Sequence, residues 1–213
     1  MTTARTSSPG RPPERHDRFP PPFVGSWCAH ARDDPITGLV AWPGFFAQLP
    51  RLMEEALRYG QCVGLAIGDV DDLKSYVEDM KARDAQSFGH LAGNAFMGRL
   101  GTIARNWLHA DSVHEGCLAT FGGDEVVLAS VTKGGAAFLP QVHRLRDALR
   151  SALPRTVAFA ATVIEPQTIP GEITGDHWWR EFCVHEIGRV ERALFENKEA
   201  RRRGHQEDSI VAV

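Results

Sequence analysis

The segment ATFGGDEVVLAS, Ala119 to Ser130, constrains the fold more than any other part of the sequence. Two short apolar runs flank a tip that carries two glycines and two adjacent carboxylates. Apolar strands joined by a short turn that contains glycine are typical of a β-hairpin, so we expect Gly122 to Glu125 to form its tip. Glycine and aspartate are also common at ordinary hairpin tips. Adjacent carboxylates repel each other, however, which makes a bound cation a reasonable compensation.

Helices and strands alternate around this hairpin. The run CVGLAIGDV predicts a buried strand of roughly six residues that ends at Asp69, and an exposed helix follows it. Pro50 is expected to begin a turn within the first helix or to kink it. Apolar periodicity predicts further helices and strands over residues 45–59, 91–108, 137–153, 156–164, 179–194 and 208–213. This order favours an α/β fold in which helices flank a mixed sheet in a single domain.

Composition narrows the classes of protein further. The chain has 213 residues and a net charge of −3, so nothing in its overall charge indicates nucleic-acid binding. The four cysteines form no CxxC pair, and we expect neither a zinc knuckle nor a disulfide framework. A reducing, cytoplasmic setting is the simplest interpretation, and no apolar run is long enough to span a membrane. Residues 1–27 hold six of the thirteen prolines and are expected to be a disordered tail ahead of a domain at 28–213.

A second acidic cluster lies in GDVDDLK, where Asp69 and Asp71 follow an apolar strand and Lys74 lies three residues further on. Acidic residues at a helix start are also favoured by the helix dipole, which is the plain structural interpretation. Mg²⁺ takes oxygen ligands and commonly reaches substrate phosphates through one or two carboxylates. Two acidic strand ends that meet in a mixed sheet would supply such a site, and neighbouring glycines would let a nucleotide approach the backbone.

The sequence resembles the GGDEF domains of bacterial diguanylate cyclases, which have a palm-like α/β core. The segments DPITGL, GDVDDLK, FGHLAGN, FGGDEV and ALFENKEARRRGH are similar to five family motifs and occur in the family's order. The resemblance runs from about Asp34 to the end of the chain and leaves only the tail outside. It implies a palm-like mixed sheet flanked by helices.

The resemblance implies a metal site and a set of catalytic residues. Asp69 and Asp124 would ligate Mg²⁺ or Mn²⁺ together with the backbone carbonyl of Val70. Glu125 would be a further ligand or would help to activate the attacking 3′-hydroxyl. Lys74 would hold the triphosphate during the reaction.

The resemblance also implies how substrate binds. Cationic side chains and backbone N–H groups would hold the triphosphate, two glycines would pass beneath the nucleotide, and one side chain would contact the base. These residues are Lys198, Arg202, Asp72, Leu73, Gly122, Gly123 and Asn94. Two protomers of a homodimer would each bind one GTP, condense them into cyclic di-GMP and release pyrophosphate.

The base pocket departs from the family pattern. Asn94 replaces an aspartate, and an amide offers one acceptor and one donor, which suits adenine, whereas a carboxylate suits guanine. ATP or a mixture of nucleotides is therefore an alternative to GTP. The second base contact has no secure position, and Asp79, Asp84 and Gln86 are all candidates. A catalytically silent nucleotide-binding module is a further alternative, which the retained acidic residues disfavour.

Overall fold

The computed structural model describes residues 27–28, 30–83, 89–110, 116–169, 175–203 and 210–213. Its centre is a six-stranded mixed sheet with the strand order β1-β3-β4-β2-β5-β6. The strands, in that order, are Val40–Ala41, Gly116–Thr120, Glu125–Thr132, Cys62–Val70, Val157–Ile164 and Ile210–Ala212. The α-helices α1 to α5 are Trp42–Arg58, Leu73–Arg83, Gly89–Ala110, Phe138–Ala152 and Asp176–Arg202. The short 3₁₀ helices η1 and η2 are Gly135–Ala137 and Pro166–Thr168.

The predicted mixed sheet, flanked by helices in one domain, is confirmed. β2 is central and pairs antiparallel with β4 and β5, whereas β1 and β6 pair in parallel with β3 and β5. β2 has nine residues, so it is longer than the strand of roughly six that the sequence predicted. α1 continues through Pro50 as one helix. β1 was not predicted, because a two-residue strand carries no periodicity.

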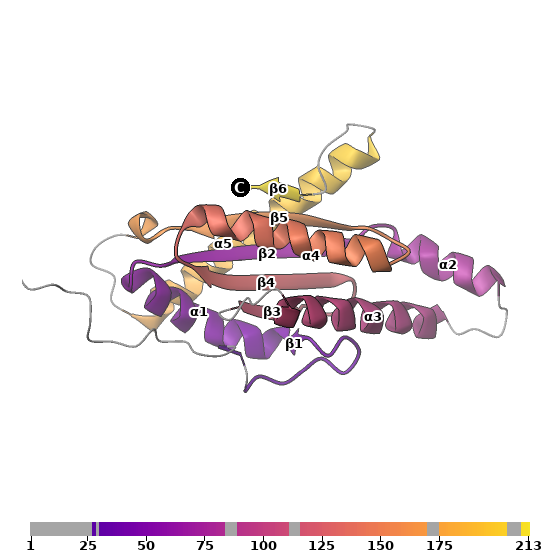
Figure 1. Cartoon of the computed structure of the whole chain (residues 1–213), viewed down its shortest axis with the longest axis horizontal. Coiled ribbons are helices and arrows are strands. Elements are labelled where there is room, and N and C mark those ends of the chain that lie inside the picture. The colour runs from indigo at the N-terminus through magenta and orange to yellow at the C-terminus, as the bar shows by residue number, and fades with distance from the viewer. Residues whose placement is uncertain (1–26, 29, 84–88, 111–115, 170–174, 204–209) are drawn as a thin grey trace, which may run out of the picture.

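Alternate residues of β2 pack into two separate hydrophobic cores, one on each face of the sheet. Val63, Leu65 and Ile67 are buried in a cluster with residues of α1 and α5. Ala66 and Val70 are buried in a second cluster with residues of α3 and α4. Figure 1 shows α3 and α4 in front of the sheet and α5 behind it. Because side chains alternate along a strand, a continuous apolar run such as β2 must be covered on both faces.

Two glycines in β2 allow aromatic rings to lie directly on the strand. A Cβ atom at Gly64 would come within 2.1 Å of the Phe138 ring, and one at Gly68 would come within 2.4 Å of the Phe159 ring. Phe138 and Phe159 are both completely buried. The glycines of β2 therefore permit close packing against α4 and β5, and any side chain at either position would displace a core aromatic ring.

The motif DPITGL has a structural role at the start of the domain. Asp34 Oδ1 accepts hydrogen bonds from the backbone N–H groups of Ile36 and Thr37 and from the Thr37 hydroxyl, at 3.1, 2.8 and 2.8 Å. Gly38 has a φ of +65°, which favours glycine. The backbone of Thr37 lies so close to α3 that a Cβ atom at Gly101 would clash with it. The motif thus fixes a turn that leads into β1.

The cysteine spacing indicated no disulfide framework, but the structure contains a disulfide. Cys28 and Cys117 form a disulfide, and both are buried. They are 89 residues apart in the chain, so cysteine spacing gave no indication that the fold brings the start of the domain onto β3. Cys62 and Cys183 are buried free thiols. Burial raises the pKa of the Cys183 thiol to about 12, so that thiol stays protonated.

The tail predicted at residues 1–27 lies outside the described residues, except for Trp27. The Trp27 side chain is buried and its ring centroid lies 5.2 Å from that of Phe45. Within the described ranges, no helix has the length and apolar character that crossing a membrane requires.

Reduction of the Cys28–Cys117 disulfide should lower the stability of the domain. The loop that it closes has a sequence separation of 89 residues, for which chain entropy gives a stabilisation on the order of 4 kcal/mol. For a chain of this size the melting temperature should fall by about 10 °C. Thermal unfolding with and without reductant measures this shift. A Cys28→Ser/Cys117→Ser variant is the control and should not respond to reductant, and an unchanged melting temperature for verified reduced wild type would contradict the prediction.

Candidate functional site

The ends of β2 and β4 bring two acidic residues together. Asp69 and Glu125 are directly opposed in the antiparallel register of these strands. Cβ atoms of such partners lie about 4.5–5.5 Å apart, and their side chains project from the same face of the sheet. The backbone N–H of Val70 also donates to the carbonyl of Asp124 at 3.1 Å. The hairpin tip therefore folds back beside the end of β2.

The conformation of the tip depends on glycine and on Thr120. Gly122 and Gly123 have φ values of +102° and +72°, in the region that other residues rarely adopt. A Cβ atom at either glycine would meet no atom within 4 Å, so the requirement is conformational. The Thr120 hydroxyl donates to the Glu125 carbonyl at 2.8 Å and accepts from the Gly122 N–H at 3.0 Å. These bonds fix the tip and present its backbone to solvent.

The Lys198 ammonium lies among the oxygens at the end of β2. Lys198 is on α5, and its Nζ donates to Asp69 Oδ1 and, at 3.2 Å, to the Val70 carbonyl. Asp71 Oδ1 lies 3.8 Å away. Only 12% of the Lys198 side chain is exposed. A buried ammonium needs such partners, so these oxygens together stabilise one positive charge.

Burial raises the pKa of two of the carboxyl groups at the site. For Asp69, loss of hydration is the largest cause; the charges of Asp124 and Asp71 act in the same direction, and Lys198 opposes them. For Glu125, burial again raises the pKa, with contributions from the charges of Asp69, Asp124 and Glu191. The carboxylates therefore repel one another across the strand ends. An additional cation would relieve this repulsion.

Two cavities border the hairpin tip: Glu125 lines one, and its neighbour Asp124 lines the other. One cavity, of about 470 Å³, is lined by Asp69, Glu125, Glu191, Leu194, Phe195, Lys198 and Arg202. The other, of about 420 Å³, is lined by Leu73, Lys74, Val77, Glu78, Lys81, Gly93, Asn94, Met97, Gly123 and Asp124. Most of the residues predicted from the sequence thus divide between the two cavities, whereas Val70, Asp72 and Gly122 line neither.

The connection between β2 and α2 has an uncommon backbone. Asp72 has a φ of +52°, and it is the only residue other than glycine with positive φ in the described part of the chain. Its carbonyl accepts from the Tyr76 N–H at 3.0 Å, and α2 begins at the next residue, Leu73. The first N–H groups of a helix have no partner within the helix and attract anions. The turn thus directs the start of α2 toward the second cavity.

Asp71 has a structural role that the sequence did not reveal. Its carboxylate accepts from the Thr156 hydroxyl at 2.7 Å and from Arg201 at 3.1 Å. Its backbone N–H donates to the Thr156 carbonyl at 2.9 Å. These bonds tie the end of β2 to β5 and α5. Arg201 is committed to this contact, whereas Arg202 lines the cavity that also holds Lys198.

The donor atoms at the end of β2 are suited to a hard cation. Within the described ranges, no three His, Cys, Asp or Glu side chains form a group that could hold a metal ion. The carboxylates of Asp69 and Glu125 and the carbonyl of Val70 nevertheless are oxygen donors of the kind that Mg²⁺ takes. The Lys198 ammonium already occupies a cation position against two of these oxygens. The residues therefore fit a magnesium ion, provided that Lys198 moves.

Three charged residues at the cavities were not among the predicted site residues. Glu78 and Lys81 line the cavity that contains Asn94, and Glu191 lines the one that contains Asp69. Helical spacing gives an indication for two of them, because Lys74, Glu78 and Lys81 are four and three residues apart and share one face of α2. Of the candidate base contacts, Asp79 forms an ion pair with Arg155 at 3.3 Å, and Asp84 and Gln86 lie outside the described residues.

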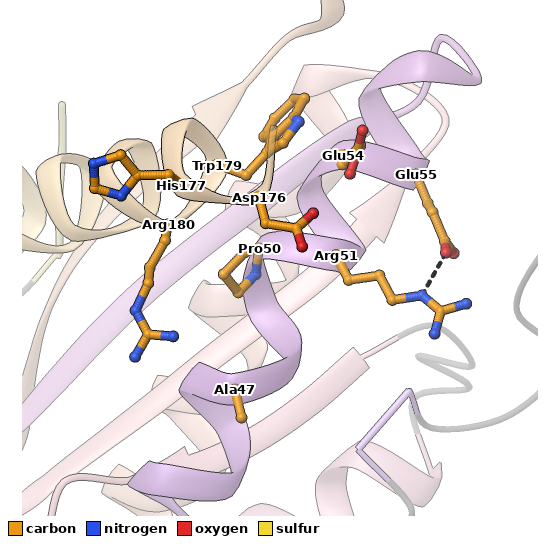
Figure 2. A pocket seen from close by; sticks show the side chains of 9 residues that line it. All are labelled: Ala47, Pro50, Arg51, Glu54, Glu55, Asp176, His177, Trp179 and Arg180. Atoms are coloured by element: carbon orange, nitrogen blue, oxygen red, sulfur yellow. Dashed lines mark hydrogen bonds and ion pairs between the residues drawn. The ribbon is translucent and has the colours of Figure 1, made fainter. Parts of the chain in front are cut away.

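Another cavity, of about 620 Å³, lies between α1 and the first turn of α5 and contains none of the predicted residues. Figure 2 shows its charged side chains on the two helices, with Arg51 turned toward Glu55. This pair is four residues apart and joined at 2.7 Å, as is usual on a solvated helix face. The cavity brings together no acids from strand ends. The site at the hairpin tip is therefore the better candidate for chemistry.

Comparison with known families identifies one match. Residues 31–158 match the family model described as "Diguanylate cyclase, GGDEF domain". That range includes β2, α2, α3 and the hairpin and ends at the start of β5. A search of curated proteins found no significant match to the chain.

Solved structures share the fold at low sequence identity. The diguanylate cyclase SiaD of Pseudomonas aeruginosa, solved with its activator SiaC, is 23% identical with a TM-score of 0.62. The match covers 85% of this chain and 61% of SiaD, so the chain spans about three-fifths of that structure. The GGDEF domain of DgcB from Caulobacter crescentus, solved with c-di-GMP, is 18% identical over 84% of this chain and 92% of that one, with a TM-score of 0.59. The FimX GGDEF domain of Pseudomonas aeruginosa is 16% identical over 85% of this chain and 98% of the FimX domain, with a TM-score of 0.57.

Replacement of Glu125 by Gln should stabilise the domain at neutral pH. The pKa of Glu125 is higher in the folded protein than in the unfolded chain, so the folded protein holds this proton more tightly. The free energy of unfolding of wild type therefore falls as pH rises from the unfolded-state pKa through the folded-state pKa. A glutamine side chain does not ionise, so the variant does not lose stability in this way. Its melting temperature should exceed that of wild type at pH 7, and the difference should shrink as pH falls toward 4. A variant less stable than wild type at pH 7 would contradict a raised pKa for Glu125 in the folded protein.

Proposed function

The chain belongs to the GGDEF-domain family, and we propose that it is a nucleotidyltransferase that condenses two GTP molecules into cyclic di-GMP with Mg²⁺ and releases pyrophosphate. The observation that carries this proposal is the pairing of Asp69 with Glu125 beside the Lys198 ammonium. Acids opposed at two strand ends, next to a cation from a third element, are suited to binding a metal ion and a polyphosphate together.

The metal would be held by the carboxylates of Asp69, Asp124 and Glu125 and the carbonyl of Val70. When bound, it would lower the pKa of the attacking hydroxyl and neutralise charge that develops on the phosphates. Lys198 now donates to Asp69 and Val70. In the loaded enzyme its ammonium would turn to the triphosphate, where Arg202, on the same cavity wall, would join it.

The remaining predicted residues would position the nucleotide. Gly122 and Gly123 carry no side chain that could obstruct a ligand at the tip. The N–H groups of Asp72 and Leu73 would bind phosphate at the start of α2. Lys74 and Asn94 line the same cavity. Lys74 would hold the phosphates at the end of this cavity next to β2, and Asn94 would contact the base. Catalysis would then rest on positioning and on charge, as in other phosphoryl-type transfers.

Use of ATP or of mixed nucleotides is a second candidate, because Asn94 replaces the family's carboxylate at a base contact. A silent nucleotide-binding module is a third. It is disfavoured because Asp69, Asp124 and Glu125 all remain, although burial and, to a lesser extent, mutual repulsion raise the pKa of Asp69 and Glu125. Such repulsion is a cost to folding that a module without catalysis has no need to keep.

Wild-type protein is incubated with Mg²⁺ and each of the four nucleoside triphosphates in turn, and it should form cyclic di-GMP and pyrophosphate from GTP. Asp124→Ala should lower the rate by about a hundredfold or more, because a metal ion contributes several kcal/mol to the transition state. Asp79→Asn is a matched control on the neighbouring helix and should keep the rate. Products are identified by mass. Absence of any dinucleotide from wild type, or full activity in Asp124→Ala, would contradict the proposal.

Condensation should require two protomers, since each is expected to present one nucleotide to the other. A monomer should therefore bind nucleotide without forming product. The rate per protomer, measured over a dilution series, should fall with the fraction of dimer obtained by light scattering. A rate per protomer that stays constant down to concentrations at which the protein is monomeric would contradict a dimeric active site.

A further inference from the structure

The cavity beside Asn94 has two distinct ends along α2. Lys74, Val77, Glu78 and Lys81 all line it from one face of that helix. An α-helix rises about 1.5 Å per residue, so Glu78 lies about 6 Å and Lys81 about 10 Å further along the axis than Lys74. Lys74 is next to the end of β2, where the phosphates would bind. Glu78 and Lys81 therefore belong to the far end, where a base would lie.

The size and the lining of this cavity suit a nucleotide base. Its volume of about 420 Å³ lies in the range of about 300–1,000 Å³ typical of small-molecule sites. Val77 on α2 and Met97 on α3 provide apolar wall. Gly93 on α3 also lines the cavity, and a Cβ atom at this position would lie 3.6 Å from Val77 Cγ2, at ordinary contact distance. The two helices are therefore close together where these residues line the cavity.

Glu78 is available to a ligand. Lys74 and Lys81 lie one turn away on the same helix, yet in the described part of the chain neither forms an ion pair with Glu78. The neighbouring acid, Asp79, is committed to Arg155 instead. Glu78 is exposed, so its carboxylate is hydrated and ready to exchange water for a ligand. It is the one carboxylate at the far end of the described cavity wall.

We propose that Glu78 reads the base of the substrate and makes the site selective for guanine despite the amide at Asn94. This inference rests on the proposed function. A carboxylate has only hydrogen-bond acceptors, and guanine presents two adjacent donors, N1–H and N2–H₂, from which the carboxylate can accept. The Asn94 amide or the Lys81 ammonium would donate to guanine O6. Adenine presents an unprotonated N1 at the same edge, which repels a carboxylate.

Binding of substrate analogues that cannot react separates base selection from catalysis. The probes are the α,β-methylene analogues of GTP and ATP with Mg²⁺, titrated calorimetrically into the full chain. Wild type should prefer the guanine analogue. Glu78→Gln should reduce that preference by about tenfold or more, the scale of one bidentate base contact. Asp79→Asn removes the adjacent charge and should leave the preference unchanged, which controls for a general effect of charge on triphosphate binding.

The outcomes distinguish this inference from the proposed function. If Glu78→Gln keeps the wild-type preference, or if wild type binds both analogues equally or favours the adenine analogue, the assignment of Glu78 is wrong while the nucleotide site stands. If wild type binds neither analogue, the proposed function and this assignment both fail. Thermal unfolding of each variant verifies that it is folded.

Discussion

Repulsion among carboxylates at one end of the sheet is the constraint on which the site depends. The register of β2 and β4 opposes Asp69 and Glu125, and burial raises the pKa of both. Such an arrangement is stable only with a cation nearby, and Lys198 supplies one by donating to Asp69 and to the Val70 carbonyl. The same oxygens that hold this ammonium are the ones a magnesium ion would take, which links the stability of the domain to its proposed chemistry.

Sheet topology explains why these residues meet. β2 is central, so its final residues contact β4 on one side and β5 on the other. Asp71 is bonded to Thr156 at the start of β5 and to Arg201 on α5, which holds the last turns of α5 over the end of β2. α5 is a single helix of 27 residues. Its packing against the sheet therefore determines where Lys198 and Arg202 lie.

The sequence was sufficient for the order of elements and for the hairpin, because long apolar periodicities and a glycine turn are local features. It was insufficient for contacts set by tertiary packing. The Cys28–Cys117 disulfide joins residues 89 apart, and no spacing rule reports such a pair. The two residues of β1 are defined only by their pairing with β3. Tertiary packing also decides which face of α2 lines the cavity next to α3. Glu78 is on that face, whereas the neighbouring Asp79 forms an ion pair with Arg155.

The most direct test of the cation site is a crystal structure of the protein with Mn²⁺ and the α,β-methylene analogue of GTP. Anomalous scattering locates the metal independently of the protein model. The metal should lie against Asp69 and the Val70 carbonyl, with the Lys198 ammonium moved onto the phosphates. A metal bound away from the end of β2, or a Lys198 that still occupies Asp69 in the presence of bound nucleotide, would contradict the idea that ammonium and metal share these oxygens.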